Sequence, residues 1–198
     1  MIASVVRRTM AMKPQVKLFT PGPLNTSQTV KEAMIYDYGS RDPDFGNIVE
    51  NIKTRLLRIA KVPSDLYAAV LVQGSGSFAV EATMATAFPR DKEYTKNKKM
   101  LIASNGAYGE RMVKICVYTN IPHDVITFKD NEPVDPNIIS AKIANDPTIS
   151  HVSLVHSETT AGLLNPIEDI GKAIHETNPD VQYIVDTMSS FGGVPIDM

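Results

Sequence analysis

Short apolar runs alternate with helical patterns over most of the chain, and this alternation limits the fold more than any other feature. The runs have the length and residue types of β-strands and lie at 67–72, 99–104, 123–128, 150–155 and 181–186. Segments of helical periodicity separate them, at 77–87, 108–118, 136–145 and 166–176. Strands that alternate with helices form parallel crossovers, so both faces of the sheet are covered. The pattern predicts a three-layer α/β fold with a mostly parallel sheet, in which ligands bind at the carboxyl ends of the strands.

The segment before the first predicted strand contains a rigid turn and two helices. The run Pro21-Gly22-Pro23 predicts an irregular turn over 18–26, because two prolines around a glycine exclude regular structure. Ser27 is a suitable N-cap for a short helix that ends near Ile35. Over 45–60, apolar residues recur at intervals of three and four between Lys and Arg, which predicts an amphipathic helix.

The first seventeen residues carry no acidic side chain and four basic ones, at Arg7, Arg8, Lys13 and Lys17. This segment is expected to be either a disordered terminus or a short organellar targeting segment. Residues 18–198 are expected to form one partial large domain.

Composition excludes several classes of protein. The net charge of −2 gives no electrostatic reason to expect nucleic acid as a partner, and no apolar run is long enough to span a membrane. The single cysteine, Cys116, excludes a disulfide framework and favours a reducing compartment. The cytoplasm is therefore expected, with the mitochondrion as the alternative. Cys116 lies inside a predicted helix and is interpreted as a buried structural thiol rather than a nucleophile.

A turn of small residues, 73–77, joins the first predicted strand to its helix and suits an anion. Gly76 allows close approach of the backbone, the helix N-terminus presents free N–H groups, and the hydroxyls of Ser75 and Ser77 add donors. A phosphate monoester would fit; a plain strand-to-helix turn is the alternative. The Walker motif is excluded because no Gly-Lys-Ser/Thr follows. A dinucleotide site is disfavoured because the next strand ends in Asn105-Gly106 rather than in an acid.

Other predicted strands also end in polar residues. Asp186 closes an apolar run, so its carboxylate needs a partner, either a protonated heteroaromatic nitrogen or, in a capping role, Ser189 or Ser190. Tyr108 lies between two glycines and could stack on a planar ring or simply pack at the start of a helix. His156 and Glu158 lie close together without a third ligand at metal spacing, so no metal site is predicted. A phosphate cradle, an aromatic ring and an acid together favour pyridoxal 5'-phosphate as cofactor.

Five motifs resemble the 2-aminoethylphosphonate–pyruvate aminotransferases, a group of class V, fold-type I enzymes dependent on pyridoxal phosphate. The motifs begin at Thr20, Gly74, Asn105, His156 and Val185, and they read TPGPL, GSGSFAVEA, NGAYGER, HSETTAG and VDTMSSFGG. The alanine–glyoxylate aminotransferases share the plan, but they tend to have Trp where this chain has Tyr108, and Glu-Ser-Ser where it has Glu-Thr-Thr at 158–160.

The resemblance implies a role for each matching residue. Ser75, Gly76 and Ser77 would bind the cofactor phosphate, and Tyr108 would stack on the pyridine ring. Thr159 would hydrogen-bond near the phenolic oxygen. Asp186 would be a catalytic residue whose carboxylate pairs with the ring nitrogen. The substrate entrance would include Pro21, Gly22 and Pro23.

The reaction implied is transfer of the amino group of 2-aminoethylphosphonate to pyruvate, which gives phosphonoacetaldehyde and alanine, in a homodimer. The family's Schiff-base lysine follows the aspartate that matches Asp186, and the chain ends at Met198 before it. The chain is therefore expected to be the N-terminal portion of such an enzyme, to lack the small C-terminal domain, and to be inactive alone. Three alternatives stay open: transamination of alanine or serine with glyoxylate or pyruvate, a non-catalytic truncated paralogue or interaction module, and a nucleotide- or methyl-donor-binding Rossmann protein.

Overall fold

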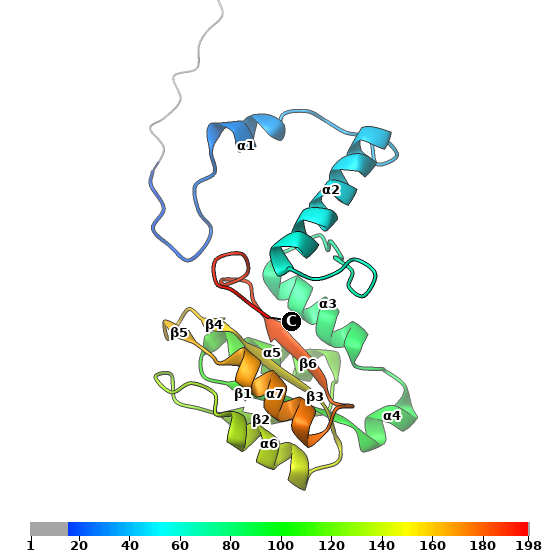
Figure 1. Ribbon diagram of the computed structural model, residues 1–198, viewed down its shortest axis with the longest axis vertical. Coiled ribbons are helices and arrows are strands. Elements are labelled where there is room, and N and C mark those ends of the chain that lie inside the picture. The colour runs from blue at the N-terminus through cyan, green and yellow to red at the C-terminus, as the bar shows by residue number, and fades with distance from the viewer. Residues whose placement is uncertain (1–15, 198) are drawn as a thin grey trace, which may run out of the picture. The chain divides into compact units, whose positions relative to one another are not determined.

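The computed structural model describes residues 16–197 (Figure 1). It contains two compact units, one that ends at Tyr38 and one that begins at Gly39. Most of the predicted terminal segment 1–17 lies outside the described residues, so the expected boundary after residue 17 stays a prediction. The first unit holds the irregular turn expected over 18–26 and the helix α1 (Gln28–Ala33), and Ser27 caps this helix by accepting a hydrogen bond from Val30 N.

The second unit contains most of the regular structure. Its helices are α2 (Pro43–Ala60), α3 (Gly76–Ala87), α4 (Lys92–Asn97), α5 (Ala107–Thr119), α6 (Pro136–Asn145) and α7 (Ile167–Thr177). Its strands are β1 (Lys99–Ser104), β2 (His123–Thr127), β3 (Ile149–Val155), β4 (Ser157–Glu158), β5 (Leu163–Leu164) and β6 (Gln182–Asp186).

Aspartate caps fix where several helices begin. Asp42, Asp91 and Asp135 precede α2, α4 and α6, and each side chain accepts a hydrogen bond from the backbone N–H two residues later. A proline follows Asp42 and Asp135, and its fixed φ suits the first helical position. The short helix α4 was not predicted from the sequence, because its polar residues show no apolar periodicity.

Four strands form one parallel sheet in the order β2-β1-β3-β6, and β4 pairs with β5 in a separate antiparallel pair. In the main sheet Ile102 of β1 aligns with Val125 of β2 and with Ser153 of β3. The crossovers run through α5, α6 and α7. The predicted parallel α/β fold is therefore confirmed, including the four later strands and their helices.

Helices cover both faces of this sheet (Figure 1). On one face α6 and α7 bury their apolar sides, with Ile139, Ile143, Ile170 and Ile174 packed against Leu101 and Leu154. On the other face α3 and α5 contribute Met84, Met112 and Cys116, which pack against Met100 and Ile102. Burial of each such side chain stabilises the fold by about 1.5–3 kcal/mol relative to exposure.

The first predicted strand, 67–72, is wrong. These residues form no regular structure, and Val70, Leu71 and Val72 are exposed. An apolar run becomes a strand only where another strand hydrogen-bonds to it, and in residues 16–197 the sheet ends at β6 without a further strand. The turn that follows nevertheless leads into α3, as predicted.

Candidate active site

The strand order places a topological switch point between β1 and β3. The chain leaves β1 toward β2 on one side and reaches β3 on the other side, so the two connections diverge at the carboxyl edge. In open parallel sheets this divergence forms the crevice in which ligands bind. The residues after β1, β3 and β6, namely 105–109, 156–160 and 186–190, are brought together at this edge.

Glu158 lies at the centre of the hydrogen bonding at this edge and is fully buried. Its Oε2 accepts hydrogen bonds from the backbone N–H groups of Tyr108 (3.0 Å) and Gly109 (3.3 Å). Its Oε1 accepts from the hydroxyl (2.6 Å) and the N–H (3.3 Å) of Thr160. A side chain at position 106 would overlap Glu158, which explains the glycine there. Glu158 therefore caps α5 and fixes the first turn that carries Tyr108.

A reciprocal pair of amides, Asn105 and Asn165, lies beneath this cap, and each residue is only 2% exposed. Nδ2 of Asn105 donates to Oδ1 of Asn165 (2.9 Å), and Nδ2 of Asn165 donates to Oδ1 of Asn105 (3.2 Å). Asn165 also accepts from Val134 N and donates to the carbonyl of Val155. The pair joins the segments after β1, β2 and β3.

The N-terminus of α3 presents donors that have no partner among residues 16–197. Ser75 is the N-cap residue, but its side chain makes no capping hydrogen bond. The N–H groups of Phe78 and Ala79 bond back to the carbonyl of Ser75, whereas in residues 16–197 those of Gly76 and Ser77 bond to nothing. Free N–H groups at the positive end of a helix dipole, beside a serine hydroxyl, form a suitable site for an anion.

Glycines shape the approach to this helix end. Gly74 has φ of 136°, a conformation that side-chain-bearing residues rarely adopt. A side chain at Gly76 would overlap Met188, so the segment after β6 lies directly against the first turn of α3. This contact brings the predicted phosphate cradle next to the residues that follow Asp186.

Asp186 ends β6 on the α3 and α5 side of the sheet. Along β6, Tyr183 and Val185 pack with the α6 and α7 cluster and Ile184 packs with the α3 and α5 cluster, so the alternation places Asp186 on the same face as Ile184. Its Oδ1 accepts a hydrogen bond from Met188 N (2.8 Å), so the local contact is with Met188 rather than with Ser189 or Ser190, the partners weighed in the sequence analysis. Asp186 is half-buried rather than buried, because β6 is an edge strand in the described residues.

Tyr108 and Ser77 are connected through Arg111, which was not among the predicted site residues. Nη1 of Arg111 donates to the Ser77 hydroxyl at 2.6 Å, and the guanidinium carbon lies 4.7 Å from the centre of the Tyr108 ring. The structure thus brings Ser75, Gly76, Ser77, Tyr108 and Asp186 to one edge; Tyr108 and Asp186 follow or end strands, whereas Ser75, Gly76 and Ser77 are placed there by the start of α3.

The predicted roles of Thr159 and of the segment 21–23 are not tested by the contacts at this edge. Thr159 is half-buried in the turn after β4, where Thr160, not Thr159, contacts Glu158 and Ala107 N. Pro21, Gly22 and Pro23 belong to the first unit, where they are exposed. Their role at a substrate entrance stays a prediction.

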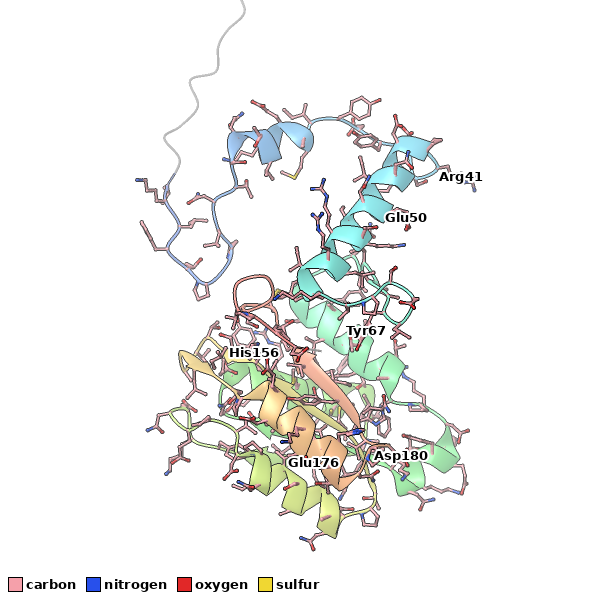
Figure 2. The ribbon with its side chains drawn as sticks, in the orientation of Figure 1. Arg41, Glu50, Tyr67, His156, Glu176 and Asp180 are labelled. Carbon is pink, nitrogen blue, oxygen red and sulfur yellow. The ribbon has the colours of Figure 1, made fainter. Side chains whose placement is uncertain are left out.

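His156 follows β3 and is 4% exposed, and Figure 2 shows it at the opposite end of the sheet from Asp180, which precedes β6. Its Nδ1 is buried without a hydrogen-bond partner in the described residues. Burial lowers the pKa of His156, and the nearby Glu168 raises it to a smaller extent. Residues 16–197 contain no cluster of three His, Cys, Asp or Glu side chains that could hold a metal ion.

Cys116 is fully buried in α5, and burial raises the pKa of its thiol to about 12. Such a thiol is protonated and unreactive at neutral pH, so the interpretation as a structural cysteine is confirmed. None of the helices in residues 16–197 combines the length and the hydropathy that membrane crossing requires.

Comparison with known proteins decides the family. The family model for aminotransferase class-V matches residues 29–198. The chain belongs to the class V aminotransferases. Among curated class V relatives, a 2-aminoethylphosphonate–pyruvate transaminase from Lactiplantibacillus plantarum is 46% identical over 94% of this chain and 49% of its own length. A bifunctional phosphonoacetaldehyde hydrolase/aminoethylphosphonate transaminase from Clostridioides difficile is 44% identical over 91% of the chain and 27% of its own length.

Solved structures of aminotransferases share the fold. An alanine–glyoxylate aminotransferase from Nostoc sp. is 26% identical and superposes with a TM-score of 0.75. The match covers 98% of this chain and 50% of the Nostoc chain. A pyridoxamine–pyruvate aminotransferase from Mesorhizobium loti has a TM-score of 0.78 at 24% identity, over 92% of this chain and 44% of its own. The chain spans about half the length of the curated transaminases it matches.

Pyridoxal 5'-phosphate is the cofactor of class V aminotransferases, and the residues at the carboxyl edge fit it. The free N–H groups of Gly76 and Ser77 match a phosphate monoester. Asp186 lies on the same face as α3, so one edge offers both an anion site and a carboxylate suited to a protonated ring nitrogen.

Proposed function

We propose that the whole protein transfers the amino group of 2-aminoethylphosphonate to pyruvate, giving phosphonoacetaldehyde and alanine. The observation that carries this proposal is the 44–47% identity, over at least 91% of the chain, to transaminases named for this substrate. Tyr108 and the Glu-Thr-Thr run at 158–160 support the same substrate class. Transamination of alanine or serine with glyoxylate or pyruvate is the second candidate, because solved structures with the same fold include an alanine–glyoxylate enzyme.

In this proposal the residues at the carboxyl edge hold the cofactor. Ser75, Gly76 and Ser77 bind its phosphate, and Tyr108 stacks on its ring. Asp186 keeps the ring nitrogen protonated through its Oδ2, since Oδ1 accepts from Met188 N. When bound and protonated, pyridoxal phosphate withdraws electrons from the bond that is broken on the substrate.

Two further roles in the proposal come from the resemblance. Thr159 hydrogen-bonds near the phenolic oxygen of the cofactor. Pro21, Gly22 and Pro23 line the substrate entrance.

We expect the 198-residue chain alone to show no turnover. Among residues 16–197, no lysine makes a hydrogen bond or ion pair with Asp186, with Tyr108 or with the first turn of α3. Lys99, for example, is paired with Asp124 and Asp146 at the amino end of the sheet. None of the lysines in residues 16–197 is therefore placed by a polar contact to attach the cofactor.

The whole protein is proposed to be a cytoplasmic homodimer. The apolar residues Ile48, Ile52 and Ile59 of α2 are 37%, 40% and 51% exposed, and no residue of this helix is buried. Exposed apolar side chains at helical spacing favour an interface. A single cysteine favours a reducing compartment, and the mitochondrion is the alternative if residues 1–17 are a targeting segment.

The function is tested with protein isolated from its natural source. The initial rate of alanine formation from pyruvate is measured with 2-aminoethylphosphonate and with serine as donor, and glycine formation is measured with alanine and glyoxylate. We expect the phosphonate donor to be preferred by at least about tenfold in kcat/KM, because a site built for a charged group discriminates strongly against ligands that lack it. A preference for alanine and glyoxylate would support the second candidate. Absence of any transamination by the isolated protein would support a non-catalytic role.

A further inference from the structure

Arg111 connects two parts of the candidate site that lie on different helices. It is in the second turn of α5, and its Nη1 donates to the Ser77 hydroxyl of α3 at 2.6 Å. The same guanidinium lies over the Tyr108 ring, 4.7 Å from its centre. One side chain therefore contacts both a residue of the phosphate cradle and the aromatic ring proposed to stack on the cofactor.

Arg111 is an exposed cation, and among residues 16–197 no carboxylate pairs with it. In the part of the chain that the structure describes, the ion pairs involve lysines, and none includes Arg111. The guanidinium is held against the first turn of α3, which is the positive end of that helix dipole. Arg111 is exposed, so its guanidinium is accessible to a ligand that binds at this helix end. The guanidinium and the free N–H groups of Gly76 and Ser77 are all donors beside Ser77, and such a set favours an anion.

The hydrogen bond also fixes what Ser77 can do. Because the guanidinium can only donate, Ser77 Oγ is the acceptor, and its own proton is available for another group. In residues 16–197 this hydroxyl donates to no protein atom, so it can donate to a bound ligand. A hydroxyl that accepts from a cation is polarised and becomes a stronger donor.

We propose that Arg111 is a positioning residue for the phosphate group of the cofactor. It acts through Ser77, whose hydroxyl it orients and polarises, and it holds the Tyr108 ring through the cation–π contact. The ligand selected in this way is a phosphate monoester of a planar ring rather than the same ring without phosphate. This inference rests on the proposed cofactor role of the carboxyl edge.

The test compares binding of pyridoxamine 5'-phosphate and of pyridoxamine, which differ only in the phosphate and do not react with lysine amino groups. Affinities are measured by calorimetry on the full chain, at one fixed ionic strength. We expect Arg111→Gln to weaken binding of the phosphorylated ligand about tenfold, since one hydrogen bond to a charged group is worth about that much, and to change pyridoxamine binding less than about twofold. Arg111→Lys keeps the charge but not the planar fork and should give an intermediate affinity.

Ser77→Ala should also lower the affinity for the phosphorylated ligand. The double variant should bind this ligand as tightly as the single variant of lower affinity, because both substitutions act on one hydroxyl. Lys114→Gln is the matched control: it removes one positive charge from an exposed position one turn further along α5 and should leave both affinities unchanged.

Equal losses for both ligands in Arg111→Gln, or no loss for either, would overturn the inference while leaving the cofactor site standing. Strictly additive effects of the two substitutions would also overturn it. If the unmodified chain binds the two ligands with equal affinity, the proposed phosphate site is wrong. The assay of amino donors described above tests the proposed reaction separately.

Discussion

At the scale of single residues, Glu158 contributes most to holding the candidate site in place. It accepts hydrogen bonds from two N–H groups at the start of α5 and two groups of Thr160, and it is fully buried. Loss of a buried acceptor leaves its donors without partners, which costs more than the net strength of the bonds. Glu158 therefore stabilises the turn on which Tyr108 lies.

We predict that Glu158→Ala lowers the free energy of unfolding by about 2–3 kcal/mol, since it removes both a charged helix cap and several buried hydrogen bonds. Urea unfolding followed by circular dichroism measures this change. The matched control is Glu176→Ala on α7, where the carboxylate is exposed and 3.9 Å from Lys172; this change should cost less than about 1 kcal/mol. Equal effects of the two substitutions would show that Glu158 is not a structural cap.

The residues of the site differ in how far the sequence could predict them. Asp186 ends a predicted strand that the structure contains, and such positions lie at one edge of a parallel sheet. Ser75, Gly76 and Ser77 were predicted from the end of the strand 67–72, which does not form, and they reach the site through the start of α3. Glu158, Asn165 and Arg111 act through partners 50, 60 and 34 positions away in the chain, and no local pattern encodes those contacts. A glutamate directly after a strand, with glycines at 106 and 109, was the available signal for the Glu158 cap.

At the scale of helices and strands, local pattern was sufficient where packing agreed with it. The helices predicted at 77–87 and 136–145 correspond to α3 (Gly76–Ala87) and α6 (Pro136–Asn145). The strand predicted at 67–72 failed because strand formation depends on a hydrogen-bonding neighbour, which the residues themselves do not specify. The antiparallel pair β4 and β5 was missed because two-residue strands carry no detectable alternation.

The amino end of the sheet carries an ionic cluster that holds β1 to its neighbours. Lys99 pairs with Asp124 and Asp146, and Lys142 pairs with Asp124. The hydrogen bonds from Lys99 and then Thr148 lower the pKa of Asp146 to about 2. A carboxyl whose pKa is lower in the folded state stabilises the fold above its unfolded pKa, near 4, and this stabilisation is lost as the pH falls toward the folded value.

We predict that Asp146→Asn lowers the free energy of unfolding by roughly 1–2 kcal/mol at pH 7, after allowance for partial solvent exposure, and by less at pH 3. Urea denaturation at the two pH values measures both differences. Asp180→Asn, at an exposed position before β6, is the control and should change stability by less than about 0.5 kcal/mol at either pH. A difference for Asp146→Asn that does not shrink at low pH would contradict the ionic role.

At the scale of the whole molecule, the second unit combines a four-stranded parallel sheet with one polar edge. Its core lies between the sheet and the helices α3, α5, α6 and α7, and α2 contributes no buried residue to it. The carboxyl edge collects the free donors of α3, the Tyr108 turn and Asp186, while the amino edge collects the ionic cluster. The proposed function accounts for this asymmetry, since the cofactor would bind at the first edge, whereas the ionic cluster at the second stabilises the fold.

The central claim is that the carboxyl edge binds the phosphorylated cofactor, and residue-resolved amide hydrogen exchange tests it most directly. Exchange is measured in the full chain with and without pyridoxamine 5'-phosphate. We predict slower exchange at the N–H groups of Gly76 and Ser77, which bond to nothing in the described protein, and around Tyr108 and Met188, with no change at the amino edge near Asp124. Protection that is absent from Gly76 and Ser77, or that appears mainly at the amino edge, would contradict the account.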